Sequence, residues 1–228
     1  MEWVIKITTN LANLREKIDK IDKNIIELIL ERMNLVHEVG LSKLQTNTRV
    51  YVPEREALIF KKLAAFSNLP AFEIQSFYTE IISFCRKLED TLSVAVNRDS
   101  ISLLGLKKIF GEYVKPIIFD NLNTFFIEKE NISYILTPLC EEMILALQSS
   151  NWFIINTTEV NSEKLYLISK YPNEITNTGD ITYILTKERF NISSYQIEEN
   201  LFFSSVESLH LEKERDVEIK ILGFVPSI

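Results

Sequence analysis

Cysteine and histidine are scarce in this sequence. Its 228 residues include two cysteines, Cys85 and Cys140, and two histidines, His37 and His210. Two cysteines so far apart cannot form a disulfide framework, and these four residues offer no zinc-type spacing. The sequence therefore predicts no metal site, and a reducing cytoplasm is the expected compartment.

An excess of positive charge and a long apolar run are also lacking. The formal net charge is −7, whereas nonspecific binding to nucleic acid or to a membrane surface needs a basic face. There is no run of roughly 18 uncharged apolar residues that could cross a bilayer. Residues 2–7 are too short and too interrupted by charge for a signal peptide. We therefore expect neither a nucleic-acid partner nor a membrane partner.

An apolar stripe near the N-terminus is interrupted by one arginine. Its alternating spacing of three and four residues predicts one long helix over residues 11–43. Arg32 occupies a position of this stripe, whose other members are Leu14, Ile18, Ile21, Ile25, Leu28, Leu35 and Val39. An unpaired guanidinium in an apolar interface costs several kcal/mol, roughly, through desolvation. We therefore expect an anionic group to meet Arg32.

Two further helices are predicted over residues 53–66 and 71–89. Pro53 is typical of a first helical turn, and acidic residues follow it there. Charged residues lie on or beside the apolar faces of the three helices: Arg15, Arg32, Lys43, Arg55, Glu56 and Glu89. Several cations at one apolar seam favour the binding of a small polyanion out of water.

Beyond residue 90 short β-rich runs alternate with helical ones. Strands are predicted over residues 92–96, 115–119, 134–137, 152–156, 165–169, 181–186, 202–205 and 217–222, and a helix over residues 100–110. Strands separated by helical segments indicate an α/β domain. The predicted fold class is therefore multidomain α and α/β, with a three-helix domain over residues 8–90 and an α/β domain over residues 91–228.

Four short runs in the helical region resemble the all-helical class of chorismate mutases. They are LREKID at residues 14–19, ER at residues 31–32, VGLSK at residues 39–43 and VPERE at residues 52–56. Their order and spacing are similar to the family's over residues 11–89. The resemblance implies an intertwined homodimer and the substrate chorismate, which is rearranged to prephenate in the shikimate pathway to phenylalanine and tyrosine.

The resemblance implies that three arginines bind the substrate. Arg32 and Arg55 would hold its two carboxylates. Arg15 would lie across the dimer interface from Arg32, so each active site would use residues of both chains. Clamping a flexible dianion in its reactive conformer is what a unimolecular rearrangement requires, and it needs no metal or other cofactor.

The resemblance also implies the groups that stabilise charge on the breaking ether bond. Lys43 would hold the ether oxygen and, with Glu56, the ring hydroxyl. Glu89 would donate a second hydrogen bond to the ether oxygen, and Cys85 would be a small packing residue beside the substrate. Lys43, Glu89 and Arg32 are therefore the expected catalytic residues.

Two positions depart from many relatives. Glu89 stands where many have Gln, and a carboxyl group donates only when protonated. We expect burial to raise the pKa of Glu89 and activity to fall as pH rises through it. Val52 stands where many have Asp, which resembles the bifunctional mutase/dehydratases.

The α/β region resembles part of a prephenate dehydratase domain and the end of a regulatory ACT domain. The similar runs are SVAV at residues 93–96, ISYILTP at residues 132–138, GDITYIL at residues 179–185 and ILGFVP at residues 221–226. However, Tyr183 replaces the arginine of the family's Thr-Arg-Phe motif, residues 97–100 replace its glycine-rich loop, and the region is far shorter. We therefore expect no dehydratase activity.

Two alternatives stay open. One is a bifunctional chorismate mutase/prephenate dehydratase. The other is a non-enzymatic helical dimerisation module whose cations pair internally with Glu56 and Glu89, since a charge in an apolar stripe often sets register only. Removing Arg32 separates a chorismate mutase from the non-enzymatic module. An enzyme should lose activity and keep its fold, whereas a protein with a buried structural ion pair should lose ~3 kcal/mol or more of stability.

Overall fold

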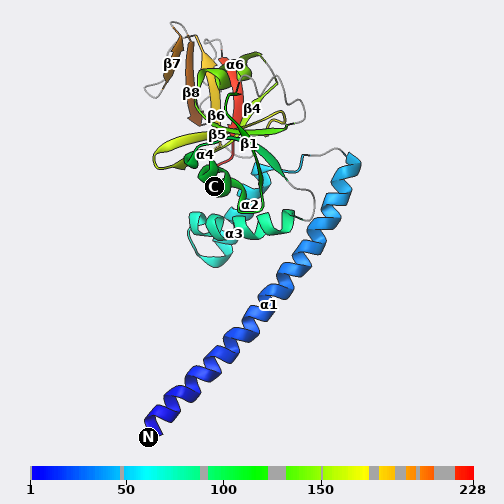
Figure 1. The fold of residues 1–228 in the computed structure, drawn as a ribbon, viewed down its shortest axis with the longest axis vertical. Coiled ribbons are helices and arrows are strands. Elements are labelled where there is room, and N and C mark those ends of the chain that lie inside the picture. Colours follow the sequence, from blue (N-terminus) through cyan, green and yellow to red (C-terminus); the bar gives the residue numbers. More distant parts are fainter. Residues whose placement is uncertain are drawn as a thin grey trace.

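The computed structural model describes residues 2–46, 49–87, 92–122, 132–149, 151–174, 180–187, 194–198, 201–207 and 219–228. A helical N-terminal region is followed by an α/β region, which confirms the predicted fold class. Figure 1 shows one long helix, α1, that extends far from a body containing all other elements.

Helix α1 spans Glu2–Thr46, longer at both ends than predicted. At 1.5 Å per residue, its 45 residues extend about 68 Å. Among the described residues, its most extensive contact with another element is with helix α3, close to Arg32. Five residues of its apolar stripe are between 47% and 64% exposed: Leu14, Ile18, Ile21, Ile25 and Leu28. This chain alone therefore leaves most of the stripe uncovered.

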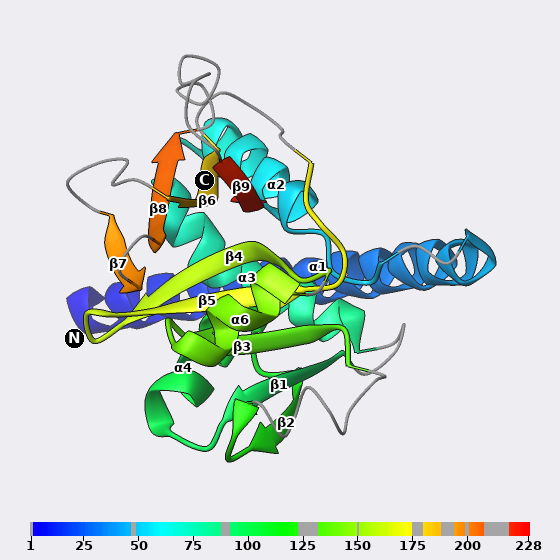
Figure 2. The same ribbon diagram turned by 90° about the horizontal axis from the view of Figure 1, so that it is seen from above.

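Helices α2 (Pro53–Ser67) and α3 (Ala71–Arg86) pack against each other. A small core of Phe60, Ile74 and Ile82 joins them. Helix α2 ends at Asn68, whose left-handed φ of 57° terminates the helix. Figure 2 shows α2 beside strand β9 (Ile219–Val225), and Lys61 donates a hydrogen bond of 3.1 Å to Ser227 nearby.

The first sheet has five strands in the order β2-β1-β3-β5-β4. Their bounds are Ser93–Asn97 for β1, Lys115–Phe119 for β2, Tyr134–Pro138 for β3, Phe153–Val160 for β4 and Glu163–Ser169 for β5. Strand β1 runs parallel to β2 and β3, whereas β5 runs antiparallel to β3 and β4. Helices α4 (Ser100–Phe110) and α6 (Glu141–Ser149) connect these strands.

The second sheet is antiparallel, with the strand order β7-β8-β6-β9. Strand β6 spans Ile181–Thr186, β7 spans Tyr195–Glu198 and β8 spans Leu201–Glu207. One apolar core joins both sheets, with Ile154 and Ile168 from the first and Leu185 and Leu222 from the second.

The helical and α/β regions share a second core. Tyr51, just before α2, is 1% exposed and packs with Leu92, Phe110 and Tyr134. The predicted domain boundary after residue 90 lies outside the described residues, which omit 88–91, and it stays a prediction. None of the described helices has the length and hydropathy of a membrane span.

Candidate active site

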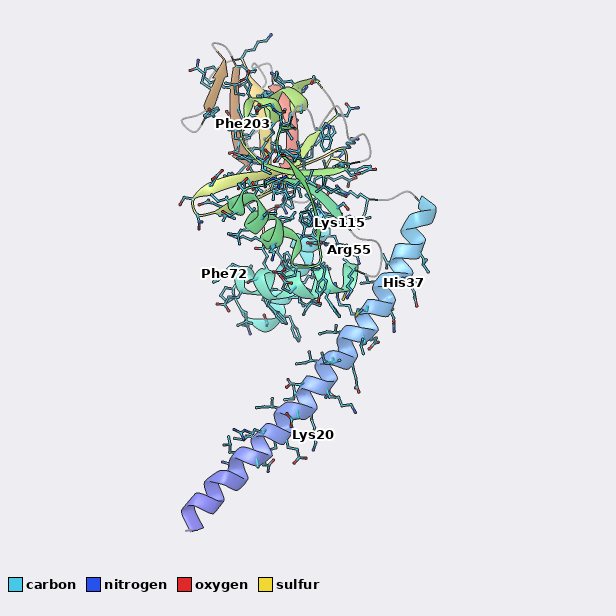
Figure 3. All side chains as sticks on the ribbon, in the orientation of Figure 1. Lys20, His37, Arg55, Phe72, Lys115 and Phe203 are labelled. Atoms are coloured by element: carbon cyan, nitrogen blue, oxygen red, sulfur yellow. The ribbon has the colours of Figure 1, made fainter. Side chains whose placement is uncertain are left out.

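A cavity of about 270 Å³ lies where the three N-terminal helices meet. Helix α1 contributes Arg32, α2 contributes Arg55 and Glu56, and α3 contributes Arg86. The remaining lining residues are apolar: Val36, Val39, Val50, Val52, Ile59 and Ile82. Figure 3 places Arg55 at the junction of the helices with the α/β body, whereas Lys20 lies on the free part of α1.

Arg32 lines the cavity from α1, beside Val36 and Val39. Its guanidinium carbon lies 5.6 Å from the centroid of the Tyr78 ring. Its Nη1 atom is shielded from solvent and has no hydrogen-bond partner among the residues that the structure describes. A buried donor without a partner carries a desolvation cost that a bound anion would remove. The cavity therefore suits an anionic ligand at Arg32.

Arg55 and Glu56 enter the cavity from the first turn of α2. Pro53 begins this helix, and the backbone N–H groups of both residues donate to the Val52 carbonyl at 3.1 and 3.3 Å. Arg55 is exposed and Glu56 is buried. Two successive residues on α2 therefore bring opposite charges to the cavity at different depths.

Arg86 is the site residue that sequence reasoning missed. Its guanidinium forms an ion pair with Glu56 and lies over the Tyr51 ring, 5.5 Å from the ring centroid. The signal was present, because Ile74, Tyr78 and Ile82 are four residues apart and Arg86 continues that row. Three arginines against one carboxylate leave two positive charges in the described lining, which suits a dianion.

The structure does not bring every predicted residue to the cavity. Arg15 is exposed on α1, seventeen residues before Arg32 and hence about 25 Å away along the helix. Cys85 is fully buried and does not line the cavity. The backbone of Lys43 belongs to α1, but its side chain lies outside the described part, and Glu89 lies outside the described residues altogether.

A resident metal has no evident site in the part of the chain described. No group of three or more histidine, cysteine, aspartate or glutamate side chains there could hold a metal ion. What the cavity offers is a set of guanidinium donors and one carboxylate acceptor in an apolar wall, an arrangement that binds and orients an anion.

Comparison with known proteins assigns the helical region to a family. Residues 14–90 match the family described as chorismate mutase type II. This confirms the resemblance seen in the sequence, and the matched segment contains every residue of the cavity named above. The N-terminal region is therefore similar to chorismate mutase type II over residues 14–90.

Two curated relatives are similar to this region. The bifunctional chorismate mutase/prephenate dehydratase of Aquifex aeolicus (strain VF5) is 37% identical over 91 residues, which cover 37% of this chain and 25% of that protein. The chorismate mutase of Methanocaldococcus jannaschii is 42% identical over 53 residues, 23% of this chain and 54% of that protein. This chain thus spans about a quarter of the length of the bifunctional relative.

Two solved structures align with a larger part of the chain. They are the quorum-quenching acylase GqqA, with a TM-score of 0.46, and the prephenate dehydratase of Streptococcus mutans, with a TM-score of 0.41. Each is 13% identical; the alignments cover 60% and 59% of this chain and 95% and 97% of the solved chains.

Proposed function

We propose that this protein is a chorismate mutase, which rearranges chorismate to prephenate in the biosynthesis of aromatic amino acids. One observation carries the proposal: Arg32 lines a cavity of about 270 Å³ within the matched segment, and its buried Nη1 atom has no hydrogen-bond partner among the described residues. Chorismate carries two carboxylates, which matches the two positive charges left uncompensated in the described part of the lining.

The rearrangement requires that the substrate be held in its reactive conformer and that negative charge on its ether oxygen be stabilised. Arg32 and Arg55 hold the two carboxylates and so keep the substrate in its compact reactive conformer. Lys43 holds the ether oxygen, where negative charge develops, and Glu56 with Lys43 holds the ring hydroxyl. A protonated Glu89 donates a second hydrogen bond to the ether oxygen. The rearrangement itself needs no cofactor.

We propose that the active unit is a homodimer in which the α1 helices pair. The uncovered apolar stripe of α1 supports this, because a helix of this length gains its stability from packing. Pairing would also carry Arg15 of one chain toward the cavity of the other, a distance that one chain cannot span. The scarcity of cysteine supports a cytoplasmic location.

We propose that the α/β region has no dehydratase activity. Tyr183, which stands in place of the motif arginine, is 1% exposed and stacks on Phe203 in the core. Asp99, in the segment that replaces the glycine-rich loop, accepts a hydrogen bond of 2.7 Å from the Ser102 N–H as the N-cap of α4. Both residues serve the fold, so an assay for phenylpyruvate from prephenate should be negative.

The dimerisation-module alternative has one observation in its favour, the internal ion pair between Arg86 and Glu56. The same alternative requires Arg32 to be paired internally as well. Arg32 Nη1 has no such partner among the described residues, and these do not include Glu89.

The test is chorismate turnover by the purified protein at pH 5 and pH 8, with prephenate identified as the product. We expect turnover, faster at pH 5 if Glu89 donates as an acid, and a loss on the order of 100-fold in Arg32→Gln, because one charged donor to the reacting dianion is removed. Arg98→Gln is the matched control, since Arg98 is an exposed arginine paired with Asp120 in the α/β region. A folded protein without turnover, or an Arg32→Gln variant that loses stability instead of activity, would contradict the proposed enzyme and support the non-enzymatic dimerisation module.

A further inference from the structure

Glu56 and Arg86 form a buried ion pair on the wall of the proposed active site. The two residues are only 9% and 8% exposed, and they come from different helices, α2 and α3. Burying two charges is costly unless each meets an opposite charge in good geometry. Their position in the lining is therefore set by each other as well as by the helices that carry them.

Glu56 lines two cavities. The first is the arginine-lined cavity described above, and the second, of about 310 Å³, lies between α2, α3 and strand β4. Glu56 lines both, and Thr79 and Asn156 line the second. Glu56 therefore borders open space in both cavities, and the ion pair with Arg86 is one interaction that fixes the position of its carboxylate.

Arg86 is in turn held by a residue of the shared core. The Tyr51 ring lies against the Arg86 guanidinium, and Tyr51 itself packs against Phe110 and Tyr134, with ring centroids 4.6 and 6.1 Å away. Its hydroxyl accepts a hydrogen bond of 2.7 Å from Asn156 on β4. Burial, and next the nearby Glu56 carboxylate, raise the pKa of Tyr51 well above its usual value, so this ring stays neutral beside the ion pair. The α/β region thereby helps to position Arg86, the residue that is paired with Glu56.

We infer that Arg86 is a positioning residue of the proposed mutase site, which holds the Glu56 carboxylate toward the ring hydroxyl of chorismate. This rests on the proposed function, and it adds a residue that acts through Glu56 without contacting substrate. It also gives the α/β region a part in the mutase reaction, through Tyr51.

A double-mutant cycle on kcat and KM tests the inference, using the full chain, Glu56→Gln, Arg86→Gln and the double variant. We expect Arg86→Gln to lower kcat by on the order of 100-fold, as for a misplaced active-site group, with KM changed less than kcat. In the Glu56→Gln background the same substitution should change kcat less than about threefold, because its target is gone. Arg86→Lys keeps a cation for Glu56 and should recover about tenfold or more of the loss.

Other results would overturn the inference. An equal loss in both backgrounds would mean that Arg86 contacts substrate directly, and an Arg86→Gln variant within twofold of the parent would mean that it does nothing for catalysis. Circular dichroism and thermal melting identify variants that fail to fold. Should Arg86→Gln fail to fold, Arg86→Met, which keeps a long side chain without the charge, provides the cycle in both backgrounds, and the same two results count against the inference. A parent without turnover would overturn the proposed function as well, whereas an active parent with an insensitive Arg86 would overturn this inference alone.

Discussion

Asn173 is a buried polar residue that joins three parts of the chain. It is 4% exposed, and its amide nitrogen donates to the Ile155 carbonyl at 2.6 Å and to the Phe224 carbonyl at 2.8 Å. Its amide oxygen accepts a hydrogen bond of 3.0 Å from Arg49, in the segment between α1 and α2. One side chain thus links both sheets to the helical region, through one buried and two partly buried hydrogen bonds.

Replacing Asn173 with Ala should therefore cost far more than a typical polar substitution. Two backbone carbonyls would lose a buried donor and Arg49 an acceptor, so we expect unfolding in urea to show a loss of about 3 kcal/mol. Asn151→Ala is the control, because Asn151 is exposed, and it should change stability by less than about 0.5 kcal/mol. Equal stabilities for the two variants would show that the bonds of Asn173 contribute nothing net.

The residues of the candidate site differ in how far the nearby sequence alone could predict them. Arg32, Arg55 and Glu56 could be predicted because each interrupts or begins a helical pattern that is visible in one stretch of sequence. Arg86 could not be assigned a role in this way. Its significance depends on Glu56, thirty residues earlier on another helix, and on a ring at Tyr51 that the chain brings close only when folded.

At the scale of elements, helix α1 stands out because a single chain does not bury its apolar stripe. The described residues of the chain leave the apolar stripe of α1 exposed. The opposite face of the helix carries ion pairs such as Lys23–Glu27, in which the Lys23 nitrogen lies 3.7 Å from a Glu27 carboxylate oxygen. One face is thus suited to a protein partner and the other to water.

Placing a charge in the stripe should therefore separate the proposed dimer. Ile21→Glu would bury a carboxylate in both copies and remove about 2 kcal/mol of apolar burial from each. We expect light scattering to report a monomer and mutase turnover to fall with it, since Arg15 would no longer reach the other chain. Lys23→Glu, on the opposite face, should stay dimeric. A monomeric parent, or an Ile21→Glu variant that remains dimeric and active, would contradict the pairing of α1.

The elements themselves were predictable where their own residues decide them. Strands over residues 115–119 and 181–186 match β2 and β6 because apolar runs end sharply there. Strand β4 was predicted to end at residue 156 but continues to Val160, because its polar second half is held by pairing with β5 across a turn at Asn161 and Ser162. Helix α6 and the short strand β7 were not predicted at all, and such short elements depend on their neighbours more than on their own periodicity.

At the scale of the whole molecule, the two sheets meet closely at Gly223. This residue of β9 has a φ of 149°, and a side-chain carbon added there would lie 2.1 Å from the Ile154 carbonyl oxygen in β4. The pairing of β6 with β9 also shifts register beside it, between Tyr183 and Ile184. The close approach of the sheets, and with it the packing of their common core, requires a residue without a side chain at this point.

Gly223→Ala should therefore disturb the packing of the two sheets and destabilise the protein. The methyl group cannot fit against backbone without moving a strand, so we expect a loss of roughly 2 kcal/mol or more in urea unfolding. Ile221→Ala, on the same strand but 46% exposed, should cost less than about 1 kcal/mol.

Because Tyr51 belongs to a core shared with the α/β region, the helical and α/β regions should unfold in one transition, followed by circular dichroism and by tryptophan fluorescence. If Gly223→Ala separated the two signals, the α/β body would be melting while α2 and α3 stayed folded, and the shared core would not be what couples the two regions.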